Sequence, residues 1–349
     1  MKRYSGPFLT EDGFIQAEVT VDERTIIEYE EGGDSGRESV IIPTLYNSHT
    51  HMNDSVVKEP PEGTIAEVVG PGGLKHKAIE NASDREITEA IKHYVLNSID
   101  NGTRNIYEFR EGGMRGIELI KPLLEGFKND IDLHIYGRPK ERTFDKEEVD
   151  KILHLTEGLG LSAYRDWPED EFLKLIDFLE TKDKHLALHC SEDVREPIEK
   201  IIDLDIHHLI HMIESTDEDL EMITEKEIPI VICPRSNLHF GKYPNISNML
   251  NKDVTLALGT DNAMFSNPNM FREMETAYKV ARLNGGVSAR EILMMVTWNP
   301  RKALNYTSNI SGQKGSSETY LVMKPARGDP YYDMVTRKTP KDIIETVKW

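Results

Sequence analysis

Short apolar runs alternate along this chain with longer segments in which apolar residues recur at helical spacing. The longer segments, several of which begin at a plausible Asp or Ser N-cap, include residues 84–100, 169–181, 217–226 and 270–284. The apolar runs are residues 40–46, 104–109, 133–137, 159–164, 185–189, 208–212, 228–233 and 254–259. A strand followed by a helix, repeated over about 260 residues, predicts an α/β protein with a closed (β/α)8 TIM barrel.

An open, doubly wound sheet is the competing architecture for the same alternation, but no Gly-x-Gly-x-x-Gly sequence follows the first run. The pattern changes at both chain ends. Residues 1–45 contain short segments separated by turns, and after a helix predicted over 289–305 the tail returns to strand-like pieces at 318–323, 328–330 and 343–349. We therefore expect a small β-sandwich subdomain from residues 1–45 and 309–349, beside a barrel of residues 46–308.

The amino-acid composition argues against two classes of binding partner, nucleic acids and membranes. The 349 residues are 38% hydrophobic, enough for a sizeable core, and 42 basic against 61 acidic residues leave a formal charge of -19. That charge repels phosphate backbones and anionic lipid, and no apolar run approaches the roughly 18 residues of a membrane span, so neither nucleic acid nor a membrane is expected as a partner. The two cysteines and the polar N-terminus favour a cytoplasmic location.

Functional groups of a β/α barrel lie at the C-terminal ends of its strands, so the residues that end each predicted strand are the first candidates. Side chains alternate along a strand, and His49 and His51 therefore project to the same side. Each histidine alone is most simply explained as a packed core residue. Together, the strand ends carry His49, His51, His189, His211 and Asp261, and this convergence favours a metal site.

Three imidazoles from His49, His51 and His189 and the carboxylate of Asp261 suit zinc or ferrous iron, with room for a water molecule. Such a cation can lower the pKa of its water from 15.7 to about 7. A two-metal site would need a bridging ligand, commonly a lysine at the end of strand four, and residues 158–164 contain none. We expect one divalent metal ion, with zinc favoured over iron.

Glu192 lies three residues after His189, where a turn could bring its carboxylate beside the metal-bound water. A glutamate that is not itself a ligand could move a proton from that water to a substrate nitrogen. His211 could hydrogen-bond the attacking oxygen or polarise the substrate. The alternative for Glu192 is an ordinary exposed acid in an acidic stretch.

The chain resembles the metal-dependent amidohydrolase superfamily, in particular its cytosine deaminase, chlorohydrolase and adenosine-type deaminase branch. The resemblance covers most of the chain and rests on these segments: 47–51 (NSHTH), 188–192 (LHCSE), His211, 233–238 (CPRSNL), 258–262 (LGTDN), 298–304 (WNPRKAL) and 328–330 (GDP). It implies a single zinc or iron at His49, His51, His189 and Asp261. It also implies that Glu192 protonates a ring nitrogen, that His211 assists and that Asp261 takes the proton of the attacking water. Such enzymes can form homo-oligomers.

Substrate contacts are less well marked. Arg110 and Arg138 follow predicted strands two and three, and arginines at a pocket mouth recognise a carboxylate, a phosphate or a carbonyl-rich ring. Either could equally be an ion-pair partner for a nearby glutamate. Asn237 and His239, after strand seven, are further candidates.

The prediction is a hydrolytic deaminase that releases ammonia from a small heterocycle such as a purine, pyrimidine or pterin. Hydrolysis of a cyclic amide, as in imidazolonepropionase-like enzymes, is the alternative reaction at the same kind of site. A barrel that uses its metal only for stability is the alternative from a different class.

Overall fold

Nine parallel strands form the larger sheet of the computed structural model, which describes residues 1–304 and 318–349. In spatial order they run β13-β12-β11-β10-β9-β8-β7-β6-β14. Because β13 and β14 are successive pieces of one segment, this order closes the sheet into a barrel, which confirms the predicted TIM barrel. The strands are β6 (Leu45–His51), β7 (Thr103–Arg110), β8 (Asp132–Gly137), β9 (Gly158–Leu161), β10 (His185–Cys190), β11 (Ile206–His211), β12 (Ile230–Ile232), β13 (Leu256–Leu258) and β14 (Asp261–Asn262).

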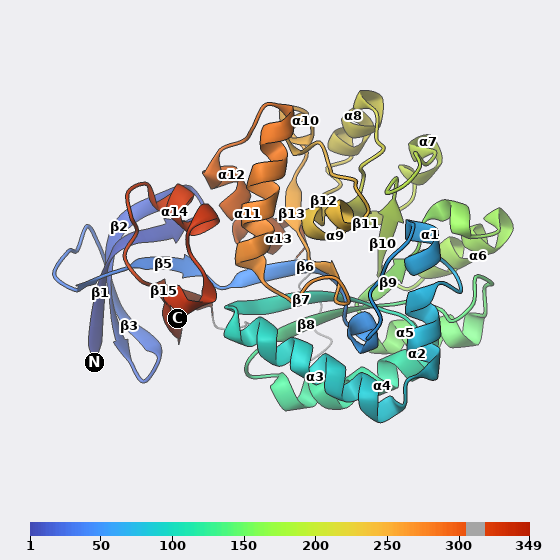
Figure 1. Ribbon diagram of the computed structural model, residues 1–349, viewed down its shortest axis with the longest axis horizontal. Coiled ribbons are helices and arrows are strands. Elements are labelled where there is room, and N and C mark those ends of the chain that lie inside the picture. Colours follow the sequence, from blue (N-terminus) through green and yellow to red (C-terminus); the bar gives the residue numbers. More distant parts are fainter. Residues whose placement is uncertain (305–317) are drawn as a thin grey trace.

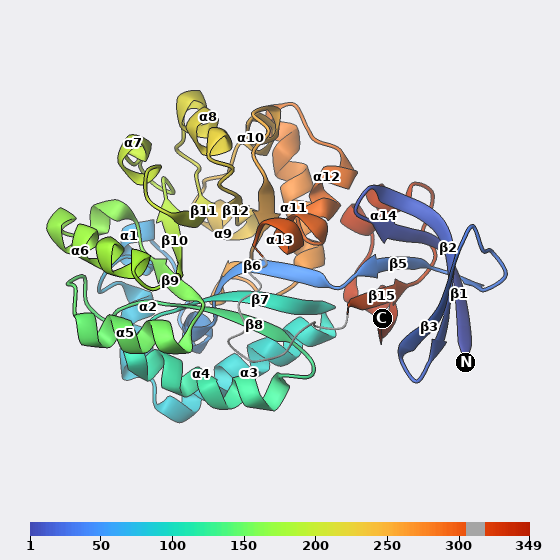
Figure 2. The same ribbon diagram turned by 180° about the vertical axis from the view of Figure 1, so that it is seen from behind.

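Helices lie outside the strands, as the two opposite views of Figures 1 and 2 show. The predicted helix over 84–100 has the same bounds in the structure, where Ser83 caps it and Glu86 completes a capping box. The helices around the barrel are α3 (Asp84–Asp100), α4 (Gly113–Phe127), α5 (Lys146–Leu155), α6 (Glu169–Glu180), α7 (Ile198–Ile201), α8 (Asp217–Glu225), α9 (Pro234–His239), α10 (Ile246–Asn251), α11 (Met270–Ala281), α12 (Ala289–Met294) and α13 (Trp298–Ala303), with short 3-10 turns η2 (Tyr164–Asp166) and η3 (Arg282–Asn284).

The single helix predicted over 289–305 is wrong, because α12 ends at Met294 and α13 begins at Trp298. The carbonyl of Val296 accepts a hydrogen bond from the backbone N–H of Tyr46 in the barrel wall. Pro300 would clash with that same carbonyl in a continuous helix, whereas it is tolerated in the first turn of a new one.

The first predicted strand is also divided. Val40–Pro43 is β5, which pairs with strands of the smaller sheet, and β6 enters the barrel from Leu45. A proline ends β5, so the uninterrupted apolar run hides a change of sheet. His49 and His51 therefore lie inside β6, where both are buried.

Both chain ends build the smaller sheet, with strand order β2-β3-β16-β15-β5-β1-β4 and a further pairing of β2 with β1. Since β2 pairs with β3 on one edge and with β1 on the other, these strands form one small closed barrel rather than two stacked sheets. The strands are β1 (Lys2–Thr10), β2 (Gly13–Asp22), β3 (Thr25–Glu31), β4 (Arg37–Glu38), β5 (Val40–Pro43), β15 (Thr319–Met323) and β16 (Ile343–Lys348). Figure 1 shows this unit, with both termini, at one side of the larger barrel.

The strand-like piece expected at 328–330 is wrong, because it is the start of α14 (Pro330–Thr336), which is followed by the short turn η4 (Pro340–Asp342). Asp329 is the N-cap, and its side chain accepts from the backbone N–H of Tyr332 at 2.7 Å. The division into residues 1–45 with 309–349 and residues 46–308 stays a prediction, and its second boundary lies outside the described residues.

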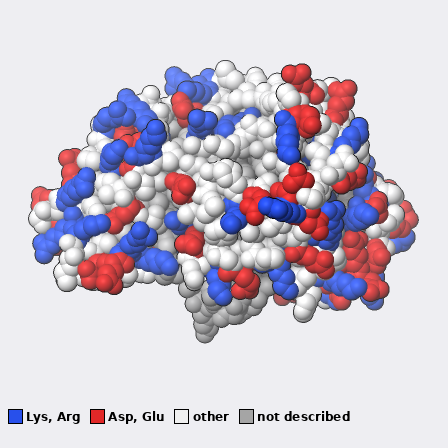
Figure 3. All heavy atoms as spheres, turned by 60° about the horizontal axis from the view of Figure 1, so that its bottom comes forward, with Lys and Arg blue, Asp and Glu red and all other residues white. Residues whose placement is uncertain are grey.

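Two surface properties bear on partners. Within residues 1–304 and 318–349, no helix combines the length and apolar character needed to cross a bilayer. On the face drawn in Figure 3, Lys and Arg side chains are interspersed with Asp and Glu. The cytoplasmic location and a homo-oligomeric state stay predictions.

Candidate active site and metal centre

The C-terminal half of β6 carries the first two candidate ligands. His49 and His51 are two residues apart, so their rings share one side of the strand. Their ring centroids lie 4.8 Å apart, with the rings at 90° to each other. Burial lowers the pKa of His49 to about 4 and the pKa of His51 well below its ordinary value. Both imidazoles are therefore neutral at pH 7 and can offer a nitrogen lone pair.

Pairing of β14 with β6 brings Asp261 beside these rings, since Asp261 is in register with Thr50. Its Oδ1 atom lies 3.3 Å from His49 Nε2 and 3.5 Å from His51 Nε2. Burial raises the pKa of Asp261, but the neighbouring rings of His49 and His211 outweigh that effect, and the pKa lies below its ordinary value. The carboxylate is thus ionised.

The other oxygen of Asp261 has partners of its own. Oδ2 accepts from Ser236 Oγ at 2.5 Å and from Asn262 Nδ2 at 2.8 Å. These contacts leave Oδ1 directed at the histidines. Ser236 and Asn262 belong to the 233–238 and 258–262 motifs, but sequence reasoning assigned neither a role, because only the fold brings α9 beside β14.

His189 on β10 faces the same point from across the barrel. Its Nε2 atom lies 3.2 Å from His51 Nε2, and its Nδ1 atom lies 2.7 Å from the carbonyl oxygen of Leu161. A carbonyl only accepts, so Nδ1 carries the proton and Nε2 presents a lone pair to the centre. Burial lowers the pKa of His189 well below its ordinary value, which keeps the ring neutral.

These donors fit a metal ion. The ligand atoms of His49, His51 and Asp261 all lie within 4.8 Å of one another, and so do those of His49, His189 and His211. Both nitrogens of His49 are buried and have no hydrogen-bond partner among the described residues. Neutral imidazoles with converging lone pairs beside one carboxylate are a donor set for zinc or ferrous iron.

Glu192 and His211 lie next to this cluster, as predicted from strand ends. Glu192 Oε2 is 3.6 Å from His211 Nε2. The side-chain amide of Asn237 lies 3.3 Å from both Glu192 Oε1 and His211 Nδ1. With that amide donating to both, His211 carries its proton on Nε2, toward Glu192. Burial raises the pKa of Glu192, which favours a carboxyl group that can hold a proton.

Backbone strain marks the same region. Ser191, His211 and Asp261 have φ angles of 48°, 76° and 55°, in the left-handed region that non-glycine residues seldom occupy. Such conformations cost of order 1–3 kcal/mol each and persist where the surrounding structure enforces them. Ser191 follows β10, His211 ends β11 and Asp261 begins β14, so the strain coincides with the candidate site.

Gly259 lies against His49, the first candidate ligand. A Cβ atom on it would lie 2.7 Å from both the Cβ and the backbone nitrogen of His49. We expect Gly259→Ala to lower the free energy of unfolding by about 1–3 kcal/mol, as overpacking of a core does. Denaturant unfolding measures this. Gly126→Ala is the control: it has open space within 4 Å in the exposed part of α4, and should be neutral or stabilising. Equal stabilities of the two variants would contradict the close packing.

Of the residues predicted to contact substrate, Arg110 is fully buried. Its Nε donates to the carbonyl of Gly116 at 2.6 Å, and its Nη1 bonds Asn53 and lies 3.5 Å from Glu108. These are the structural partners considered as its alternative. Its substrate role stays a prediction.

Arg138 lies nearer the cluster. Its Nη1 is 2.9 Å from Glu111 Oε1, and its Nε donates to the carbonyl of Gly160. The same oxygen of Glu111 is 3.0 Å from Lys75 Nζ and 3.8 Å from His51 Nδ1. Burial raises the pKa of Glu111, but the charges of Lys75 and Arg138 outweigh it and lower the pKa. The sequence marks Glu111, which directly follows β7, only as an ion-pair partner for the two arginines, and the structure adds its contacts with Lys75 and His51.

His239 on α9 is exposed, and its Nε2 lies 2.7 Å from the carbonyl oxygen of Pro61. Its ring stacks on Phe265, with centroids 4.1 Å apart. His239, which follows β12, thus contacts both Pro61 in the segment after β6 and Phe265 in the segment after β14. Its contact with substrate, like that of Asn237, stays a prediction.

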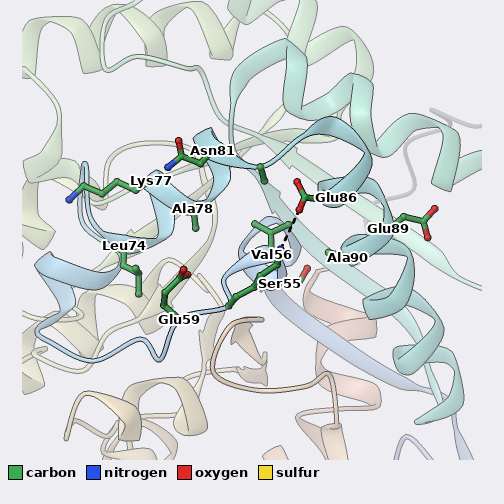
Figure 4. Close-up of a pocket in the computed structure, with 12 residues that line it drawn as sticks. Ser55, Val56, Glu59, Leu74, Lys77, Ala78, Asn81, Glu86, Glu89 and Ala90 are labelled. Atoms are coloured by element: carbon green, nitrogen blue, oxygen red, sulfur yellow. Dashed lines mark hydrogen bonds and ion pairs between the residues drawn. The ribbon is translucent and has the colours of Figure 1, made fainter.

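A cavity of about 600 Å³ lies between η1 (Met52–Val56), α2 (Leu74–Asn81) and α3. Figure 4 shows Ser55, Leu74, Ala78 and Glu86 on its walls. None of the candidate ligands lines it. It is therefore a surface feature beside the segment that follows His51, separate from the cluster of candidate ligands.

Comparisons with known proteins agree with this geometry. Residues 40–312 match the Amidohydrolase family. An uncharacterized protein of Methanocaldococcus jannaschii is 31% identical over 99% of this chain and 93% of its own length. A 5-methylthioadenosine/S-adenosylhomocysteine deaminase of Caldanaerobacter subterraneus subsp. tengcongensis is 30% identical over 79% of this chain and 70% of its own length.

The structure of a zinc-bound adenosine deaminase from Xanthomonas campestris shares the fold, with a TM-score of 0.79 over 99% of this chain and 91% of that one, at 14% identity. The resemblance drawn from the motifs is thereby confirmed. The protein is an enzyme that hydrolyses C–N bonds, and its family depends on metal. The chain belongs to the amidohydrolase family.

Proposed function

We propose that this chain is a hydrolytic deaminase with one zinc ion, acting on the amino group of a purine, and in particular of an adenine nucleoside. The observation that carries the proposal is the proton-handling pair of Glu192 and His211, 3.6 Å apart, directly beside the candidate ligand cluster. The deaminase name of a relative that aligns with 79% of this chain supports the substrate class.

We assign His49, His51, His189 and Asp261 as the residues that would hold the metal. When bound, the metal supplies an activated water at neutral pH. β9, the fourth strand of the barrel, has the sequence Gly-Leu-Gly-Leu and offers no lysine as a bridging ligand, which supports a single metal. The choice of zinc over iron rests on the donor set alone.

The side chains of this chain would divide the proton transfers. Deamination needs a proton on the ring nitrogen as the carbon is attacked, and a carboxyl group whose pKa is raised by burial can give it. His211 Nε2–H can donate to the attacking oxygen. Asp261 is ionised and can accept the proton that this oxygen loses. Each group lies within 4.8 Å of the others through its ligand atoms, so one substrate can reach all three.

A cyclic amide could be hydrolysed at the same cluster, but it needs no proton on an amidine nitrogen. The acid beside His211 therefore favours deamination, and the two reactions differ in their products, since only deamination releases ammonia.

An ammonia-release screen tests the proposal. Zinc-loaded enzyme would be assayed with adenosine, 5-methylthioadenosine, S-adenosylhomocysteine, guanine and cytosine, with a metal-free sample as control. We expect ammonia in amounts equal to the deaminated product from at least one adenine nucleoside, and none from the metal-free sample. Ammonia only from cytosine would contradict a purine substrate, and ammonia only from guanine would contradict an adenine nucleoside as the substrate. No ammonia from any compound, with ring-opened product from a cyclic amide, would contradict the reaction.

A further inference from the structure

The buried carboxylate of Glu111 lies beside His51, one of the proposed metal ligands. Glu111 follows β7, and its side chain is 9% exposed. Its Oε1 atom lies 3.8 Å from His51 Nδ1, the ring nitrogen that faces away from the cluster. His51 Nδ1 is buried and has no hydrogen-bond partner among the described residues. A shift of about 1 Å would bring these two atoms to hydrogen-bond distance.

An ionised carboxylate beside Nδ1 favours the tautomer of His51 that carries its proton on that nitrogen. A neutral imidazole has one N–H, and an ionised carboxylate can only accept. A proton on Nδ1 therefore leaves the lone pair on Nε2, which lies 3.2 Å from His189 Nε2 and 3.5 Å from Asp261 Oδ1. Carboxylates that hold the distal nitrogen of a metal-binding histidine fix its ring and raise its basicity.

Two cations hold Glu111 in this place. Lys75 Nζ and Arg138 Nη1 lie 3.0 Å and 2.9 Å from Oε1. Arg138 follows β8 and is anchored to the barrel by the carbonyl of Gly160. Lys75 lies on α2, in the segment between β6 and α3, and its side chain is only 3% exposed. A buried lysine is rare unless it is paired, so this contact joins α2 to the centre of the barrel.

We propose that Glu111 is a positioning residue for His51, and that Lys75 holds Glu111 so that the segment over 52–81 is coupled to the metal centre. The inference rests on the proposed role of His51 as a ligand. The path runs from α2 through Lys75, Glu111 and His51, with contacts of 3.0 and 3.8 Å. Neither Glu111 nor Lys75 need touch substrate in this arrangement.

The alternative is that Lys75 contacts the substrate directly. Removal of Lys75 would then change KM and leave metal affinity as it is. Removal of a positioning residue changes metal affinity without any substrate present.

The test measures zinc affinity of the full chain by competition with a chromophoric chelator. We expect Glu111→Gln to weaken zinc binding about 10–100-fold, the range found when such a partner is removed. Lys75→Met should weaken it less, about 3–10-fold, and Lys75→Arg should restore it, because the cation is kept. The double variant Glu111→Gln/Lys75→Met should bind zinc like Glu111→Gln alone, since both changes remove one contact path.

Lys77→Met is the matched control. Lys77 lies two residues further along α2, is exposed and lines the cavity of Figure 4. Its zinc affinity should stay within about twofold of the unchanged protein. Thermal unfolding of each metal-free variant shows whether it is folded, and if Glu111→Gln is not, Glu111→Asp takes its place, with a shorter side chain that should also weaken zinc binding.

Zinc affinity within twofold of the unchanged protein for folded Glu111→Gln would overturn the inference. Unchanged affinity with a raised KM for Lys75→Met would assign Lys75 to the substrate instead, and overturn its part. Failure of the proposed reaction looks different: the unchanged protein would then bind zinc and show the variant effects, yet release no ammonia. An unchanged protein that binds no zinc would overturn both.

Discussion

Replacement of Glu192 by glutamine is expected to lower kcat for the best substrate by about 10²–10⁴-fold, the range for loss of a general acid or base. Glutamine keeps the shape of the side chain and its contact with the Asn237 amide, but it cannot carry the proton to a ring nitrogen. Zinc content should stay at the level of the unchanged protein, because we do not assign Glu192 as a ligand. Steady-state kinetics and metal analysis on the same sample measure both quantities.

Asp193→Asn is the control for this change. Asp193 is the next residue, is exposed, and pairs with Lys242 at 3.2 Å on the surface. Its removal should alter kcat by less than about twofold, since exposed ion pairs contribute little. Full activity of Glu192→Gln with bound zinc would show that proton transfer does not run through Glu192. Loss of zinc in this variant would show instead that it is a ligand.

Replacement of His189 by asparagine is expected to weaken zinc binding by more than about 100-fold. Removal of a residue that only hydrogen-bonds a metal ligand already weakens metal binding about 10–100-fold. His189 Nε2 presents its lone pair to the cluster, held by the bond from Nδ1 to the Leu161 carbonyl. Activity should fall with the bound metal. Zinc per chain after dialysis, and activity on the same sample, measure the change.

The outcome for zinc separates this variant from Glu192→Gln, which should keep its metal. His154→Asn, at an exposed position in the last turn of α5, should change neither zinc content nor activity. If His189→Asn retained one zinc per chain at the original affinity, the assigned set of ligands would be wrong. Restoration of the activity of His189→Asn by excess zinc would agree with the assigned set of ligands, because it would show that the variant only binds zinc more weakly.

Much of the fold followed from local pattern. The helix over 84–100 has the predicted bounds because its capping box and its apolar spacing are both encoded within a few residues. The single strand predicted over 40–46 is divided between two sheets in the structure. Nothing local in an apolar stretch marks the point where the chain leaves one sheet for another. Pro43 and the pairing of β5 with β15 decide that point.

The candidate site divides in a similar way. Strand ends in a β/α barrel converge whatever the details of packing, so His49, His189 and Asp261 could be grouped from sequence. The contacts of their neighbours could not be predicted. No pattern in the sequence pairs Lys75 with Glu111, and the two side chains meet only because the fold brings α2 beside the end of β7.

The sequence by itself determined the barrel, the apolar and polar faces of its helices, and the histidines and carboxylates at its strand ends, because each depends on the period of neighbouring residues. Only the tertiary structure decided which nitrogen of His189 faces the cluster and which oxygen of Asp261 is directed at the histidines. It also decided which side chain lies beside Nδ1 of His51. Hydrogen-bond and ion-pair partners are chosen by distances of a few ångströms between segments far apart in the chain, and no local pattern encodes those distances.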